Sequence, residues 1–508
     1  MAATSATTKQ PPGLATQAFW LTASKLLAAA LNVGLPILLV RLLPQTEYGI
    51  LKEALLFVST AASVATFGVG MSAYYYVPRQ PERGGQIALN ILVYNFIAGW
   101  IPLLLIVFYP GILRSLFRTD ALTPLAWLLG LLVLLTLSAG LVQQIPTALQ
   151  DVRYSTIFIV GTQAVRAITL AAAALWFRTV ESIIWASVLN QVLAIALLYW
   201  YLDGKFPRFW AQFDWDFFKE QLAYALPYGA FGMMWVIQQN LDNYFVSASL
   251  GPKWYAIYSV GWVEVPLLTL AVESVASVMI VRVSALEKEG RKADIRYVTA
   301  AATNRLAAIQ FPMFAVLFVA GHDLIVLLYT RTYEQSANIF LVSIVLLLLG
   351  VFLLDPIIRA YKHLRNFLLV VRLCIFVALF CVLGPVIHHF GMMGAAVTAV
   401  VAQVFERFII AWAAARVVEA SPRDVRLYVD LFKVTGCTLL AGVVAYIVRN
   451  LLPAPLLIPR IIAVGLCVSA IYLPAMFIFK LPGWEMLTKD RIFSMVRTTL
   501  RRLRSASA

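Results

Sequence analysis

The chain has 508 residues, of which 61% are hydrophobic and 13% charged, and its mean hydropathy is +0.83. A soluble domain carries about 25% charged residues, so this composition excludes an ordinary water-soluble fold. The formal net charge of +15 comes largely from Lys and Arg in short polar connections. We read it as a signal of membrane orientation, and we expect no nucleic-acid partner.

Apolar runs long enough to cross a bilayer follow one another along the chain. A hydrocarbon core about 30 Å thick needs roughly 20 helical residues per crossing, with backbone hydrogen bonds made inside the crossing. The sequence therefore predicts an all-α polytopic membrane protein with about fourteen transmembrane helices. They are expected at residues 17–40, 50–76, 87–109, 121–145, 155–177, 181–202, 221–247, 255–281, 297–319, 337–358, 366–387, 392–415, 430–451 and 460–479.

The polar connections differ in charge between the two faces of the membrane. Fourteen crossings put both termini on one face, whose connections hold 26 Lys and Arg, whereas those of the opposite face hold 8. This asymmetry predicts cytoplasmic termini. Residues 1–16 are expected to be a polar cytoplasmic arm without a cleavable signal peptide, and residues 481–508 a basic cytoplasmic tail.

Cysteine and histidine give no sign of a metal site or cofactor. The four cysteines lie in apolar runs without a CxxC spacing, and the four histidines lie at or near expected helix ends. We therefore predict no metal, no disulfide framework and no bound cofactor.

Two stretches that follow expected spans one and seven resemble a known family. The first is RLLPQTEYG at residues 41–49, and the second is LPYGAFGMMWVIQQNLDNYFVSASLGPKWYAIYSVG at residues 226–261. They resemble the bacterial polysaccharide and lipid-linked oligosaccharide (Wzx-like) flippases of the multidrug/oligosaccharidyl-lipid/polysaccharide exporter superfamily. The residues that carry the resemblance are Arg41, Leu42, Pro44, Glu47, Tyr48, Gly49, Pro227, Asp242, Leu250, Gly251 and Tyr258.

The resemblance implies two six-helix lobes in parallel pseudo-repeat, because the two motif stretches also resemble each other and are six spans apart. Two further helices follow the lobes. The expected boundaries are 17–203 for the N-lobe, 204–220 for an amphipathic cytoplasmic linker, 221–418 for the C-lobe and 419–480 for helices 13 and 14.

The function implied is translocation of a polyprenyl-diphosphate-linked oligosaccharide from the inner to the outer leaflet of the bacterial cytoplasmic (inner) membrane. Alternating access, coupled to H⁺ or Na⁺, would drive this step. The implied partners are the lipid-linked glycan and membrane lipids, together with a polysaccharide polymerase and glycosyltransferases.

Several cations lie inside expected spans, where each costs about 2.5–3.5 kcal/mol on insertion scales. At 1.5 Å per residue, four of them lie roughly 9–12 Å from the cytoplasmic edge, and Arg166 lies near mid-membrane. We expect a cationic cavity that binds the diphosphate through charge-assisted hydrogen bonds. Its predicted residues are Lys25, Asn32, Arg166, Arg305 and Arg372.

Other arrangements of these charges stay open. Lys25 or Arg372 could extend to the membrane interface instead of facing a cavity. Glu406 and Arg407 could each pair with a neighbouring helix. Lys52 lies near the outer end of the second span and is not part of the expected cavity.

Aromatic and polar residues recur at helical spacing along span seven. We expect Tyr224, Tyr228, Trp235 and Gln239 to face the sugar, with packing between the lobes as the alternative. The ion-coupling candidates are Asp242, Glu264 and Glu273, for each of which an interhelical hydrogen bond is the alternative. Asp355 and Arg359 are spaced i, i+4 and should form a local ion pair.

Three rival functions remain. A drug/cation antiporter of the same fold should have an acidic cavity, and a peptidoglycan lipid-precursor flippase would share the anionic cargo. A membrane-embedded polysaccharide polymerase or ligase generally needs a sizeable external loop, whereas the external connections here are short. We therefore predict a transporter and not an enzyme.

Overall fold

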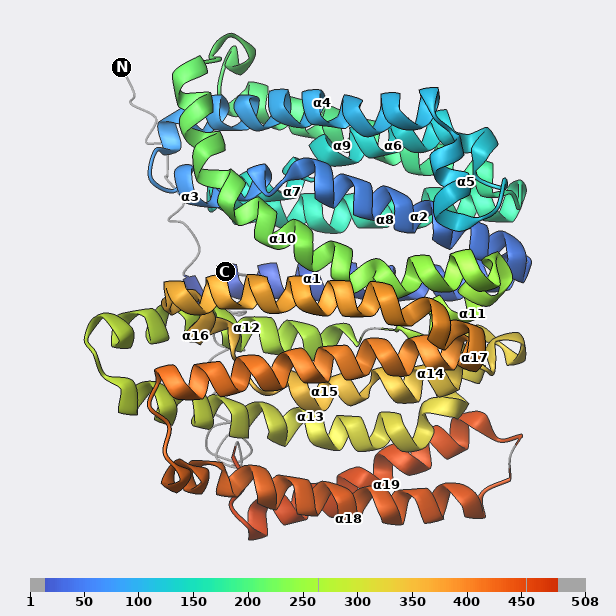
Figure 1. Ribbon diagram of the computed structural model, residues 1–508, viewed down its shortest axis with the longest axis vertical. Helices are drawn as coiled ribbons and strands as arrows, with labels where there is room; N and C mark the ends of the chain where they lie inside the picture. The colour runs from blue at the N-terminus through green and yellow to red at the C-terminus, as the bar shows by residue number, and fades with distance from the viewer. Residues whose placement is uncertain (1–13, 264, 454, 483–508) are drawn as a thin grey trace, which may run out of the picture. The chain divides into compact units, whose positions relative to one another are not determined.

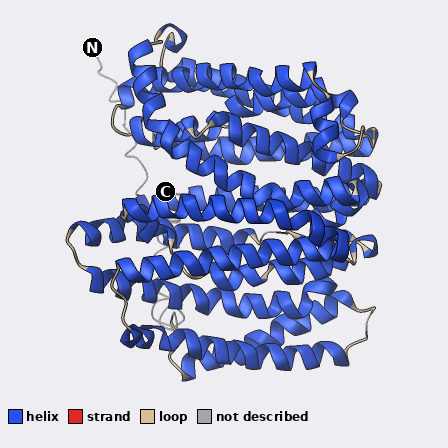
Figure 2. Ribbon diagram, viewed as in Figure 1, coloured by secondary structure: helices blue, strands red, loops and turns tan. Residues whose placement is uncertain are grey.

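The computed structural model describes residues 14–263, 265–453 and 455–482, and all regular structure in these ranges is helical (Figure 2). The contacts divide the chain into two compact units, Met1–Ala256 (unit 1) and Ile257–Ala508 (unit 2). The expected arm and basic tail lie almost wholly outside the described ranges.

Eleven helices among the described residues are long and apolar enough to cross a membrane. The all-α polytopic class is therefore confirmed, and each expected span coincides with a helix or with consecutive helices. The counts differ at three places. Expected spans 366–387 and 392–415 form one bent helix, expected span 337–358 is broken into three short helices, and expected span 221–247 lies in α10, which is not among the eleven.

Unit 1 is a bundle in which α4 packs on α6, α6 on α9, and α8 on both α1 and α9 (Figure 1). Its helices are α1 (Leu14–Leu42), α2 (Gln45–Thr66), α3 (Ala73–Tyr76), α4 (Gly84–Phe108), α5 (Gly111–Phe117), α6 (Ala126–Ala139), α7 (Leu141–Ala148), α8 (Val152–Trp176), α9 (Val180–Lys205) and α10 (Trp215–Leu250). The next helix, α11 (Pro252–Gly261), begins in unit 1.

The first motif stretch forms the turn between α1 and α2, as predicted. Pro44 is the N-cap of α2, where a residue without a backbone N–H costs no hydrogen bond. Gly49 follows in the first turns of α2, and a Cβ there would overlap the backbone carbonyl of Pro252. The two motif stretches therefore meet inside unit 1, and only glycine permits this close approach.

Helix α10 packs on α2 and belongs to unit 1, whereas sequence analysis assigns it to the second lobe. A second close approach supports this packing: a Cβ at Gly229 would overlap the carbonyl of Phe67, which caps α2 in a left-handed conformation. The pseudo-repeat of two six-helix lobes stays a prediction.

Unit 2 is built around the long helix α13, on which α18 and α19 pack. The remaining helices form a second group, in which α12 packs on α16 and α17 packs on α14, α15 and α16 (Figure 1). The bounds are α12 (Pro266–Lys288), α13 (Lys292–Tyr329), α14 (Ser336–Ser343), α15 (Val345–Gly350), α16 (Asp355–Ala360), α17 (Lys362–Val417), α18 (Val429–Leu451) and α19 (Leu457–Ile478). The predicted Asp355–Arg359 pair is confirmed on α16, at 3.2 Å.

Helix α17 has 56 residues, far more than one crossing needs, and it bends at Gly391. This residue has φ 59° and ψ −150°, a combination that is essentially restricted to glycine. The bend falls between the two expected spans, so one continuous helical segment supplies both of them.

A buried carboxylate fastens the last two long helices to α13. Asp323 accepts hydrogen bonds from Arg449 at 2.6 and 3.0 Å and from Arg460 at 3.3 Å. Arg460 also donates to the backbone carbonyl of Arg449. Arg449 and Arg460 therefore form an ion-pair network with Asp323 among α13, α18 and α19.

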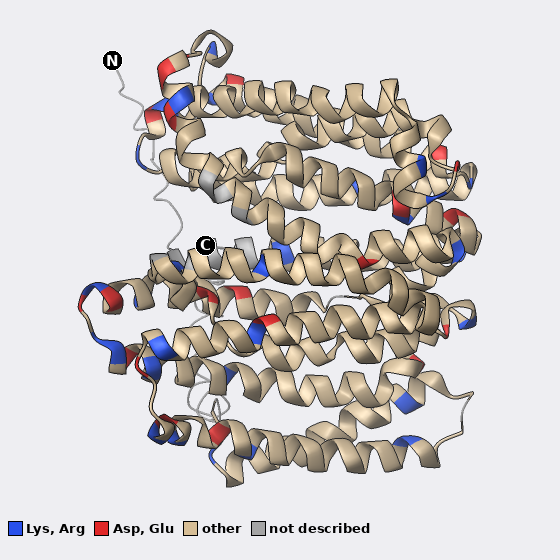
Figure 3. Cartoon of the chain, in the orientation of Figure 1, with Lys and Arg blue, Asp and Glu red and all other residues tan. Residues whose placement is uncertain are grey.

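Charged side chains gather at the helix ends in each unit (Figure 3). At one such end, Arg296 donates to the carbonyls of Val418 and Glu419 just beyond α17 and so caps its C-terminus. Lys292 donates a hydrogen bond to the Glu419 carboxylate, which holds the pKa of that carboxyl below its usual value. These contacts join the start of α13 to the end of α17.

Candidate functional site

Three of the five expected cavity residues lie on two neighbouring helices of unit 1. Lys25 and Asn32 are exposed on α1, and Arg166 is exposed on α8, along which α1 packs. All three residues lie in the middle portions of these two helices.

Lys52, which sequence analysis left out of the cavity, joins this group. Its ammonium lies 5.5 Å from the centre of the Tyr48 ring and is close enough to the Arg166 guanidinium for the two charges to interact. Two cations from α2 and α8 repel each other in a medium of low dielectric constant. An anionic group placed between them would convert this repulsion into attraction.

The other two expected cavity residues belong to unit 2. Arg305 is exposed on α13. Arg372 is largely buried and donates a hydrogen bond to Glu406 at 2.9 Å, which joins the two arms of α17. The sequence left the partner of Glu406 open, and the structure shows that Arg372 is its partner.

The predicted sugar-facing stripe on α10 contains residues in different surroundings. Tyr224 stacks on Tyr75 with ring centres 4.3 Å apart, whereas Trp235 is 45% exposed and Gln239 is half-buried. The side chain of Tyr228 lies outside the described part of the structure. Packing explains Tyr224, and a sugar-binding role for the stripe stays a prediction.

A buried polar network near Tyr224 was not expected from the sequence. Gln221 on α10 donates to the Ser72 hydroxyl at 2.7 Å and accepts from Asn90 on α4 at 3.2 Å. Gln221 and Asn90 are single amides in apolar helices, and the sequence does not show that they are partners because they are far apart along the chain. This network fixes the beginning of α10 against α4 and the segment before α3.

The three ion-coupling candidates also differ in position. Asp242 is buried on α10, whereas Glu273 is exposed on α12. Glu264 lies outside the described residues. Among the described residues, no group of three or more His, Cys, Asp and Glu side chains is arranged to hold a metal ion.

Sequence analysis missed one intramembrane acid, Glu53. Its side chain is 0% exposed on α2, and the hydroxyl of Ser247 on α10 donates a hydrogen bond to its Oε1. The signal that could have found it is its place in the second span, directly after Lys52.

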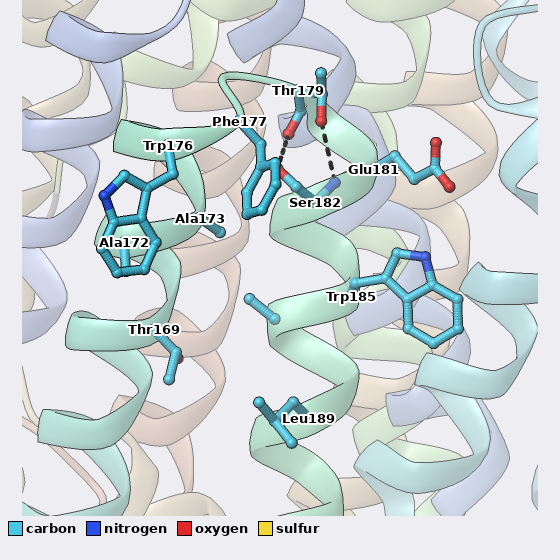
Figure 4. Close-up of a pocket in the computed structure, with 11 residues that line it drawn as sticks. Thr169, Ala172, Ala173, Trp176, Phe177, Thr179, Glu181, Ser182, Trp185 and Leu189 are labelled. Carbon is cyan, nitrogen blue, oxygen red and sulfur yellow. Dashed lines mark hydrogen bonds between the residues drawn. The ribbon is translucent and has the colours of Figure 1, made fainter.

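A separate cavity of about 530 Å³ lies between the C-terminal end of α8 and the N-terminal end of α9 (Figure 4). Small residues line it, among them Ala172, Ala173 and Ala186, and Trp176 and Trp185 stand beside it. Its lining includes Thr169, three residues beyond Arg166, but no predicted cavity residue. With one carboxylate and no cation in its lining, this hollow does not suit a phosphate.

The fold is that of a class of membrane transporters. Over 93% of this chain and 100% of the other, the structure resembles an inward closed lipid II flippase MurJ, with a TM-score of 0.66 and 14% identity. It also resembles an inward-facing multidrug resistance MATE family transporter of the MOP superfamily, over 79% of this chain and 98% of that one, with a TM-score of 0.61 and 13% identity. A third similar structure is a MOP superfamily transporter from Pyrococcus furiosus that is described as having a binding pocket of reverse polarity. The match covers 80% of this chain and 96% of that one, with a TM-score of 0.56 and 13% identity.

The sequence itself gives the family. Residues 38–338, more than half of the chain, match the family model described as "Polysaccharide biosynthesis protein", and the chain belongs to this family. Among curated proteins, none matches the sequence significantly. The family and the shared fold agree with the resemblance to Wzx-like flippases of the MOP superfamily that the sequence motifs show.

Proposed function

We propose that the chain is a flippase that moves a polyprenyl-diphosphate-linked oligosaccharide from the inner to the outer leaflet by alternating access. The polysaccharide biosynthesis family supports a glycan precursor as cargo, and the shared fold supports transport. The observation that carries the proposal is the pair of intramembrane cations Lys52 and Arg166, which come from different helices of unit 1.

A diphosphate fits this pair because its oxygens accept charge-assisted hydrogen bonds from both ammonium and guanidinium groups. The isoprenoid tail would stay in the bilayer, so only the headgroup needs a polar path. For alternating access, the headgroup must contact the inward-open and outward-open states differently, since a ligand with equal affinity for both shifts neither.

The test replaces Arg166 in a strain whose surface polysaccharide depends on this chain. We expect R166Q to lower surface polysaccharide about tenfold or more at equal protein level, because hydrogen bonds to charged groups contribute about 1.5–3 kcal/mol. R166K, which keeps the charge, should retain part of the activity. The matched control is R153A, which removes an exposed arginine near the start of the same helix.

Unchanged export in R166Q would remove Arg166 from cargo binding. A fall in export with accumulation of the lipid-linked oligosaccharide at the inner leaflet would support the proposal. Accumulation of the peptidoglycan lipid precursor would instead identify that molecule as the cargo. Altered drug resistance without any effect on polysaccharide would favour the antiporter.

We further propose a bacterial inner-membrane location with cytoplasmic termini, which the Lys and Arg asymmetry of the connections supports. In that orientation, glycosyltransferases would supply the cargo on the cytoplasmic side and a polymerase would use it on the outer side. Coupling to an ion gradient is also part of the proposal.

A further inference from the structure

Glu53 is the most deeply buried carboxyl among the described residues of unit 1. Its Oε1 accepts the hydrogen bond from Ser247, and its Oε2 has no hydrogen-bond partner among the described residues. Both residues are 0% exposed. This side chain lies about 12 Å from the start of α2 at 1.5 Å per residue, within the span.

The surroundings of Glu53 hold few groups that could balance a negative charge. Tyr255 on α11 interacts electrostatically with Glu53 and Tyr48 of α2 and with Asp242 and Tyr244 of α10. Of the other helices that pack on α2, α4 and α6 carry no Asp, Glu, Lys or Arg, whereas α1 carries Lys25 and Arg41, and α9 carries Glu181, Asp203 and Lys205 in its first and last turns. On α2 itself, Lys52 is directed toward the Tyr48 ring and Arg166.

An ionised carboxylate is therefore poorly accommodated here. Removing a charge from water costs many kcal/mol unless partners replace the water, and one hydroxyl replaces only part of it. A neutral carboxyl, in contrast, leaves only the uncharged O–H group at Oε2 without a partner, which costs less.

We propose that Glu53 is a proton-binding site of the transporter, fixed by Ser247, that takes up one proton from the outer aqueous side and releases it inward during the cycle. This inference rests on the proposed function, since it names the coupling ion and its residue. The proton bonds to a Glu53 oxygen and later leaves the same carboxyl, so the site alternates between neutral and singly negative forms.

The meeting of the two motif stretches explains how the site is built. Gly49 lets the start of α2 touch Pro252 at the start of α11, and this contact brings Tyr255 near Glu53. Ser247 lies one turn before Gly251, which ends α10. Small changes in the packing of these helix ends would therefore open or close the carboxyl to water.

The experiment measures proton uptake by purified full-length protein in liposomes that contain a pH-sensitive dye, after the outside is acidified. We expect Glu53→Gln, which mimics the neutral carboxyl, to lower uptake at least tenfold. The matched control is Asp120→Asn, an exposed acid paired with Arg114, which should leave uptake unchanged. A second arm replaces the proton gradient by a sodium gradient at constant pH.

Three results would overturn the inference: proton uptake in Glu53→Gln at the wild-type rate, no proton uptake by the wild type, or sodium-driven export that is indifferent to pH. If Glu53→Gln does not fold, infrared spectra of the wild type and of Ser247→Ala test the inference instead. We expect a band of a protonated carboxyl that shifts in Ser247→Ala, and absence of such a band would also overturn the inference.

The proton site and the cargo site can fail separately. R166Q should lower export about tenfold or more, whereas the protonated Glu53 carboxyl should persist in its infrared spectrum. Proton uptake that depends on Glu53, together with unchanged export in R166Q, would support the proton site and contradict the proposed cargo site.

Discussion

At the scale of single residues, the contacts of intramembrane charges separate structural roles from transport roles. Arg372 and Glu406 satisfy each other in a largely buried pair, whereas Lys52 and Arg166 carry like charges that interact. A paired charge needs no ligand, whereas two neighbouring cations favour an anion. The expected cavity residues therefore have different roles: Arg372 is part of a structural ion pair, whereas Arg166 is a candidate for binding an anion.

We predict that Arg372 stabilises the folded protein. R372A should lower the free energy of unfolding by about 3–5 kcal/mol, because it leaves the Glu406 carboxylate buried without its partner. The measurement is the apparent unfolding midpoint of the purified protein in detergent. R305A, at an exposed position on α13, should change this midpoint little.

A double replacement of Arg372 and Glu406 by Met should recover most of the midpoint, since apolar residues of similar volume often replace a buried pair without loss. If R372A unfolds at the wild-type temperature and yet loses export, Arg372 is a cargo ligand, as the sequence-based hypothesis holds.

At the scale of elements, α17 shows how one residue divides a helical segment into two crossings. Within α17, only Gly391 has non-helical φ and ψ, and the bend there allows the chain to return through the unit. The adjacent histidines, His388 and His389, precede this bend, which accounts for their place near the end of an expected span.

Gly391→Ala should destabilise unit 2, because an alanine in this backbone conformation is strained by about 1–3 kcal/mol. We expect a lower yield of monodisperse protein and a lower unfolding midpoint. Gly436→Ala on α18 is the matched control, since its φ is ordinary and an added Cβ would meet no atom within 4 Å. Equal behaviour of the two variants would show that the bend tolerates side chains.

At the scale of the whole molecule, the orientation in the membrane follows from the distribution of Lys and Arg over the connections. In unit 1, residues 43–44 join α1 to α2, and residues 109–125, which include α5, join α4 to α6. Both segments overlap connections between the predicted spans. The side of the membrane on which each turn lies stays a prediction.

Labelling of single cysteines tests this orientation. In a background with Ala at Cys374, Cys381, Cys437 and Cys467, S115C on α5 should react with a membrane-impermeant maleimide in intact cells. E289C, at the end of α12, should react only after the membrane is opened. The reverse pattern would place the termini outside and contradict the proposed direction of transport.

Much of the fold could be predicted because the bilayer imposes a simple rule on the sequence. Apolar runs of a given length must be helices, so the positions of the spans follow from composition alone. The i, i+4 pair of Asp355 and Arg359 was also predictable, since both partners lie on one helix. Glu53 was missed because its partner, Ser247, lies on a helix 194 residues away in sequence.

The sequence by itself determined the membrane class, the approximate spans, the family motifs and the expected orientation. Only the tertiary structure decided that Gly49 meets Pro252, that Ser247 fixes Glu53, and that Arg372 is paired with Glu406. The physical reason is that helical periodicity gives the face on which a residue lies, whereas its partner depends on how neighbouring helices rotate and cross.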